Sequence, residues 1–167
     1  MKTLTTTLTT IVLASSVSLA NANEISVGGK NFTEQQLLAT MTTQYLDGLG
    51  YDVDSRAGMG SAILRQAQEN GQIDLYWEYT GTSLINYNDI SESLSPEETY
   101  QRVKELDAEK GLTWLEPSDA NNTYALAMRE AAVEERGIRT LSDLAEAVNN
   151  EEGLMFGLDA EFYPREH

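Results

Sequence analysis

Short apolar runs alternate with segments of helical periodicity along most of this chain. Runs rich in strand-forming residues predict strands at residues 24–27, 51–56, 73–77, 113–115, 124–128 and 154–157. Apolar positions three or four residues apart predict helices whose N-terminal caps are Thr33, Ser61, Ser95 and Thr140, with a further helix through Leu84. Strands separated by helices indicate an α/β fold with a parallel sheet. In such sheets ligands bind at the carboxyl ends of the strands, so the loops that follow strands are the candidate sites.

The first residues have the pattern of a secretory signal peptide. Lys2 supplies positive charge, an apolar run follows from Ile11 to Ala20, and Ala20-Asn21-Ala22 matches the A-x-A pattern that signal peptidase cuts after. The apolar run is too short to span a bilayer. We therefore expect cleavage near Ala22 and a periplasmic or extracellular protein; a retained N-terminal anchor is the alternative.

The composition excludes several classes of function. The chain has 167 residues, 11 Lys plus Arg against 27 Asp plus Glu, no cysteine and one histidine, His167. The absence of cysteine excludes disulfides and Cys-based zinc sites. A histidine-dependent hydrolase would have to use the last residue as its base. A net charge of −16 argues against nucleic acid as a partner. We expect no enzyme, no cofactor and no metal site.

Two loops that follow predicted strands carry candidate binding groups. Residues 29–35 open a helix, whose free backbone N–H groups attract an anion, and Asn31 and Gln35 add polar side chains. In the second loop, Tyr79 could offer its ring to a cation and Thr82 its hydroxyl to an oxyanion. Ordinary helix capping in the first loop, and a packed tyrosine in the second, are the alternatives.

A third candidate is Tyr124. It follows the polar turn Asn121-Asn122-Thr123 and opens a predicted strand. A half-buried tyrosine at a crossover between domains is the alternative.

Five segments together resemble one known family. They are residues 29–35 (GKNFTEQ), 78–82 (EYTGT), 111–117 (GLTWLEP), 121–127 (NNTYALA) and 156–162 (FGLDAEF). In this order they resemble the substrate-binding proteins of glycine betaine/choline/carnitine ABC transporters, which take up osmoprotectants. The resemblance covers nearly all of residues 24–165.

The resemblance implies a two-lobed periplasmic-binding-protein fold of type II that closes on a quaternary ammonium compound and delivers it to an ABC permease. Tyr79 and Tyr124 fall on two positions of a tyrosine cage, and Gln35 and Thr82 fall on polar contact positions, with Asn31 as a further candidate. Since a quaternary ammonium group has no N–H to donate, aromatic faces recognise it, at roughly 0.5–2 kcal/mol per ring. Thr82 is neutral, which favours a zwitterionic ligand.

The expected division of the chain is a signal peptide at 1–22, the first part of lobe 1 at 23–118, and the start of lobe 2 at 119–167. Compared with the family, only the N-terminal part of the two-lobed fold is present, and further cage residues would lie beyond His167. We therefore expect weak ligand affinity and poor solubility or stability of this chain alone, because sheet edges and apolar faces would be uncovered.

Other readings of the function remain open at this stage. The chain could be an effector-sensing module of the same fold, a non-functional fragment or a secreted enzyme. Glycine betaine, choline, carnitine and proline betaine all stay open as ligands, with the neutral Thr82 favouring the zwitterions among them.

Overall fold

The computed structural model describes residues 24–159 and 161–163. Its sheet is built around β1 (Glu24–Lys30), which pairs in parallel with β2 (Asp52–Met59) through the connecting helix α1 (Thr33–Gly48). On the other side of β1, Leu75 forms a parallel bridge with Val27. The predicted signal peptide, with its cleavage point at Ala22, and His167 lie outside the described residues.

Two helices cover opposite faces of β1. A side chain at Gly28 would meet Leu64 of α2 (Ser61–Glu69) at 2.5 Å, and one at Gly29 would meet Ala39 of α1 at 2.9 Å. Because successive residues of a strand point to opposite faces, α1 and α2 lie on opposite sides of the sheet. A methyl group at either position would overlap the covering helix and would force Leu64 or α1 to shift.

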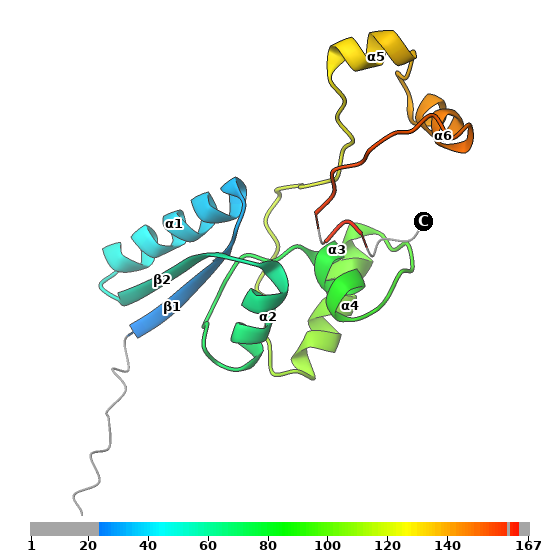
Figure 1. Ribbon diagram of the computed structural model, residues 1–167. Helices are drawn as coiled ribbons and strands as arrows, with labels where there is room; N and C mark the ends of the chain where they lie inside the picture. Colours follow the sequence, from blue (N-terminus) through cyan, green and yellow to red (C-terminus); the bar gives the residue numbers. More distant parts are fainter. Residues whose placement is uncertain (1–23, 160, 164–167) are drawn as a thin grey trace, which may run out of the picture.

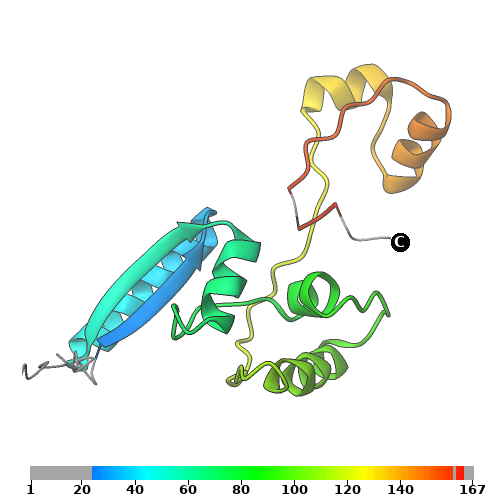
Figure 2. The same cartoon turned by 60° about the horizontal axis from the view of Figure 1, so that its bottom comes forward.

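The remaining helices come after the sheet strands in the sequence. They are α3 (Thr80–Thr82), the π-helix η1 (Ser83–Tyr87), α4 (Pro96–Ala108), α5 (Glu130–Arg136) and α6 (Leu141–Asn149). Figures 1 and 2 both show α5 and α6 apart from the sheet, joined to the rest of the fold by the segments before α5 and after α6. The last described residues return beside α3. Among the described residues, no helix is long and apolar enough to cross a membrane.

The apolar core lies between the sheet and α2. Leu64, Ala67 and Ile73 are buried together, with Met59 and Tyr76 packed against them. The outer face of α1, by contrast, leaves large apolar side chains exposed, at Leu37, Met41 and Tyr45. These three side chains therefore point away from the sheet, and the small side chain of Ala39 packs on it.

A buried ion cluster joins α2 to α4 and is named here the Asp107 cluster. Asp107 is 0 % exposed, and both of its carboxylate oxygens accept hydrogen bonds from the Arg65 guanidinium, at 2.6 and 3.0 Å. Ser83, Asn88 and Trp114 donate to the same carboxylate. Burial by itself would raise the pKa of Asp107, but these donors outweigh it and lower the pKa to about 2.

Two of the four predicted helix starts are confirmed in detail. Ser95 and Thr140 each cap a helix, and the carboxylates of Glu98 and Asp143 complete capping boxes. The other two were placed one residue too late. Phe32 is the N-cap of α1 and Gly60 that of α2, with no side-chain cap, so Thr33 and Ser61 are the first helical residues.

Several predicted strands are wrong. Residues 113–115, 124–128 and 154–157 form no strand, and 73–77 contributes one bridge. A strand needs a neighbour that accepts its backbone hydrogen bonds, and these later segments have none among the described residues. Met155 is accordingly 97 % exposed. The short α5 was missed, although it ends at Gly137, which adopts a left-handed φ of 70°.

Candidate functional site

The first two candidate loops meet at the carboxyl end of β1. Gln35 is buried in the first turn of α1, and its Nε2 donates to the backbone carbonyl of Trp77 at 2.9 Å. The backbone N–H of Lys30 donates to Gln35 Oε1 at 3.4 Å. The amide of Gln35 therefore ties the loop after β1 to the loop after the Leu75 bridge. Asn31, two residues before the start of α1, is exposed.

Tyr79, in the second loop, contacts residues of the first loop. Its ring stacks on that of Phe32 with centroids 6.2 Å apart, and Lys30 Nζ lies 5.1 Å from its centroid. Its hydroxyl donates to Glu34 Oε2 at 3.1 Å. Burial raises the pKa of Tyr79, with the carboxylate of Glu34 adding to the effect. The ring is thus fixed on several sides while it stays half-buried.

The third candidate loop reaches the first through one contact that the sequence reasoning missed. Asn122 Nδ2 donates to Glu34 Oε2 at 2.6 Å, on the same carboxylate oxygen that Tyr79 uses. Asn122 belongs to one of the five family segments, but its partner Glu34 lies 88 residues away in sequence, so no local pattern predicts this contact.

Thr82 and Tyr124 are linked through the last described segment. Thr82 is buried, and its hydroxyl donates to Glu161 Oε2 at 3.3 Å. Tyr124 packs edge to face against Phe162, with ring centroids 5.1 Å apart. The structure therefore brings Gln35, Tyr79 and Thr82 into one region and connects Tyr124 to it through residues 161–162.

A buried group of three charges, named here the Lys30 triad, lies beneath these residues. Lys30 is 0 % exposed, and its Nζ lies 2.7 Å from Glu78 Oε1 and 3.0 Å from Glu161 Oε1. Burial raises the pKa of Glu78. Burial also acts to raise the pKa of Glu161, but hydrogen bonds from Ser61, Lys30 and Thr82 and the charge of Lys30 leave that pKa below its usual value.

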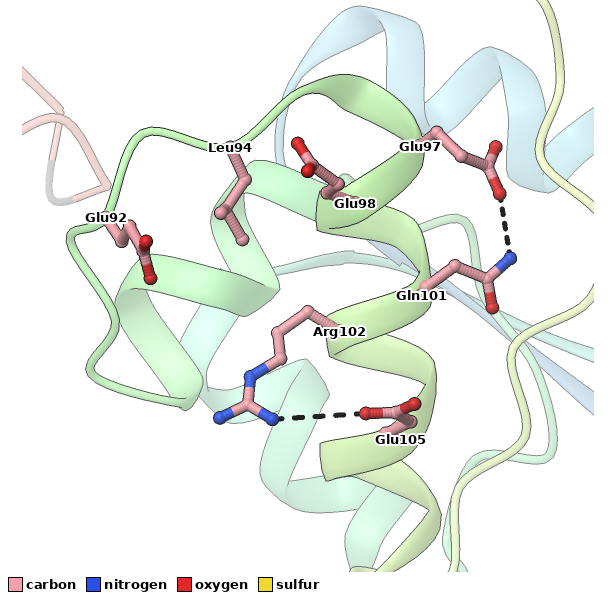
Figure 3. A pocket seen from close by; sticks show the side chains of 7 residues that line it. All are labelled: Glu92, Leu94, Glu97, Glu98, Gln101, Arg102 and Glu105. Atoms are coloured by element: carbon pink, nitrogen blue, oxygen red, sulfur yellow. Dashed lines mark hydrogen bonds and ion pairs between the residues drawn. The ribbon is translucent and has the colours of Figure 1, made fainter.

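A hollow on the surface lies elsewhere. It has a volume of about 410 Å³ and is formed on and before α4 by Glu92, Leu94, Glu97, Glu98, Gln101, Arg102 and Glu105 (Figure 3). The lining has four carboxylates and no aromatic ring, and no predicted site residue takes part in it. Its chemistry is that of a solvated acidic helix face. Among the described residues, no group of three or more His, Cys, Asp or Glu could hold a metal ion.

Comparison with known proteins decides the family. Residues 23–167 match the substrate binding domain of ABC-type glycine betaine transport systems. The chain belongs to this family. Its members are substrate-binding proteins that act outside the cytoplasm, as the resemblance of the five segments predicted.

Individual relatives agree with this assignment. The chain is similar to a glycine-betaine-binding protein of Pseudomonas aeruginosa, 48% identical over 153 residues, covering 88% of this chain and 49% of the relative. It is also similar to the glycine betaine-binding protein YehZ of Escherichia coli, 31% identical over 159 residues, covering 93% and 52%. The chain spans about half the length of these curated relatives.

A solved structure supports the fold. Apo YehZ from Escherichia coli superposes with a TM-score of 0.58 and 33% sequence identity, covering 86% of this chain and 53% of that one. The predicted periplasmic-binding-protein fold of type II is therefore confirmed for this member of the family.

Proposed function

We propose that this protein captures a quaternary ammonium osmolyte for delivery to an ABC permease, after secretion through the signal peptide at residues 1–22. Tyr79 and Tyr124 are the aromatic contacts, and Gln35, Thr82 and Asn31 the polar ones, at the junction of lobe 1 (23–118) and lobe 2 (119–167). The names of the relatives, which refer to glycine betaine, support the ligand class.

The observation that carries the proposal is the charge around the Tyr79 ring. Glu34 bonds its hydroxyl, and the Lys30 triad beneath it contains two carboxylates against one ammonium. With these groups ionised, the immediate surroundings of the ring have an excess of negative charge. Such a field attracts a cation. Because Lys30 Nζ and Phe32 already contact the Tyr79 ring, a quaternary ammonium group would meet the part of the ring that they leave exposed, a contact that hydrogen bonds cannot supply.

The geometry at Thr82 bears on the choice of ligand. Its hydroxyl donates to Glu161, so a ligand carboxylate at that point would meet a carboxylate rather than a donor. This contact works against the argument for a zwitterion from the neutrality of Thr82. Glycine betaine and choline therefore both belong in the binding test. If the ligand tail lies at Thr82, choline, which has no carboxylate, should bind more tightly than glycine betaine.

The first test is the loss of the Tyr79 ring. We expect Tyr79→Ala to weaken binding of choline or glycine betaine by about 2- to 30-fold, the equivalent of roughly 0.5–2 kcal/mol. Tyr79→Phe should retain most of the affinity, because the π-face remains. The measurement is titration calorimetry of the full chain.

Two controls make the result specific. Tyr45→Ala, at a ring 69 % exposed on α1, should bind like the parent chain. 3,3-Dimethylbutanol, the uncharged isostere of choline, should bind more weakly than choline because it lacks the cation. Equal affinity of Tyr79→Ala and Tyr45→Ala, or no binding of any quaternary ammonium compound, would contradict the proposal.

A further inference from the structure

The Lys30 triad connects both candidate rings, although neither belongs to it. Lys30 is the last residue of β1, Glu78 precedes Tyr79, and Glu161 precedes Phe162, the ring that packs against Tyr124. Three chain segments that are far apart in sequence thus meet at one buried ammonium group.

On the Tyr79 side, Glu78 transmits the position of Lys30. Glu78 Oε1 accepts from Lys30 Nζ at 2.7 Å and from the backbone N–H of Tyr79, also at 2.7 Å. Glu78 Oε2 accepts from the Tyr76 hydroxyl at 2.7 Å. Both oxygens of this carboxylate are therefore engaged, and they hold the backbone from which the Tyr79 ring projects.

On the Tyr124 side, Glu161 links Lys30 to the short turn that begins at Asp159 and contains Phe162. Asp159 Oδ1 accepts from the backbone N–H groups of Glu161 and Phe162, at 2.9 and 2.8 Å. The side chain of Glu161 then attaches this turn to Lys30 at 3.0 Å and to Thr82 at 3.3 Å. The turn places Phe162 against Tyr124.

We propose that Lys30, Glu78 and Glu161 are positioning residues, which orient Tyr79 and Tyr124 relative to each other before any ligand binds. Lys30 fixes the first ring through Glu78 and the second through Glu161 and Phe162. The inference rests on the proposed function only in its choice of these two rings. It concerns the unliganded chain, so it stands or fails separately from ligand binding.

The experiment uses the full chain with 3-fluorotyrosine in place of tyrosine, observed by fluorine NMR without ligand. Single Tyr→Phe substitutions assign the resonances. We expect Glu161→Ala to shift the Tyr124 resonance, which loses the ring current of Phe162, and the Tyr79 resonance, because Lys30 moves. Glu161→Gln keeps hydrogen-bonding atoms at this position, so the Tyr124 resonance should move back towards its chemical shift in the parent chain.

Further variants separate positioning from general loosening. Phe162→Leu should shift the Tyr124 resonance and leave the Tyr79 resonance unchanged. Glu152→Ala, at an exposed glutamate, should shift neither. Tyr100, which is 5 % exposed in α4, reports whether the chain stays folded. The proposal is overturned if Glu161→Ala leaves Tyr79 and Tyr124 unshifted, or if it shifts them no more than Tyr100.

Discussion

Replacing Asp107 by alanine is expected to destabilise the chain by about 3–5 kcal/mol, because the Arg65 guanidinium, 5 % exposed at its side chain, would stay buried without its carboxylate partner. Ser83, Asn88 and Trp114 would lose an acceptor at the same time. Native domains have a free energy of unfolding of about 5–15 kcal/mol, so this loss is a large share of the total. The measurement is the urea midpoint followed by circular dichroism.

A surface pair provides the control for this result. Asp54 and Arg56 form an ion pair at 2.7 Å with side chains 39% and 47% exposed. Pairs of this kind contribute about 0–1 kcal/mol. Asp54→Ala should therefore leave the urea midpoint almost unchanged. If Asp54→Ala and Asp107→Ala shift the midpoint equally, the Asp107 cluster does not have the stabilising role assigned to it.

The Asp107 cluster also makes the free energy of unfolding depend on pH in the acidic range. The pKa of Asp107 is lowered to about 2 in the folded chain, against about 3.9 for an unfolded aspartate. A lowered folded pKa stabilises the fold above the unfolded value, and the stabilisation disappears as the pH falls from about 3.9 to 2. Asp107→Asn should lose this contribution to the pH dependence of the urea midpoint in that range.

Lys30→Met is the second substitution with a large expected effect. It would leave the carboxylates of Glu78 and Glu161, with side chains 7% and 15% exposed, without the ammonium between them. Breaking a buried ion pair in this way costs about 3–5 kcal/mol at neutral pH. The urea midpoint at pH 7 measures the effect.

The pH dependence identifies the cause of this loss. Burial already raises the pKa of Glu78, and removal of Lys30 raises it further, because the positive charge that favours the carboxylate is gone. The deficit of Lys30→Met should therefore be largest above this pKa and shrink as the pH falls and Glu78 takes up a proton. Lys30→Met combined with Glu78→Gln should recover part of the midpoint at pH 7. A pH-independent deficit would argue against the charge explanation.

Local patterns predicted the local parts of the fold. Glu24–Lys30, Asp52–Met59 and the helices with capping boxes follow from strand propensity, apolar spacing and N-cap chemistry within a few residues. The strands expected at 124–128 and 154–157 failed because a strand depends on a partner that its own sequence does not specify. The same apolar run can be a paired strand or an exposed segment.

In the candidate site, too, the local features could be predicted from the sequence and the long-range contacts could not. Sequence motifs selected the loops that contain Gln35, Tyr79 and Thr82, and these loops do meet. The ion pairs beneath them could not be predicted, because Lys30 finds its partners 48 and 131 residues away, where no periodicity links them. Sequence reasoning treated Lys30 and Glu161 as members of motifs, and only the fold shows that they share a contact.

The two carboxylates of the Lys30 triad also differ in the length of chain that must close before each one reaches Lys30. The entropy lost on closing a loop grows with the logarithm of its length, so the Glu161 contact costs only about 0.9 kcal/mol more than the Glu78 contact. The Lys30–Glu78 pair needs only the chain up to residue 78, whereas the Glu161 contact needs the chain up to residue 161. The part of the chain up to residue 78 therefore contains a partner for its own buried cation, and Glu161 adds a second carboxylate to that pair.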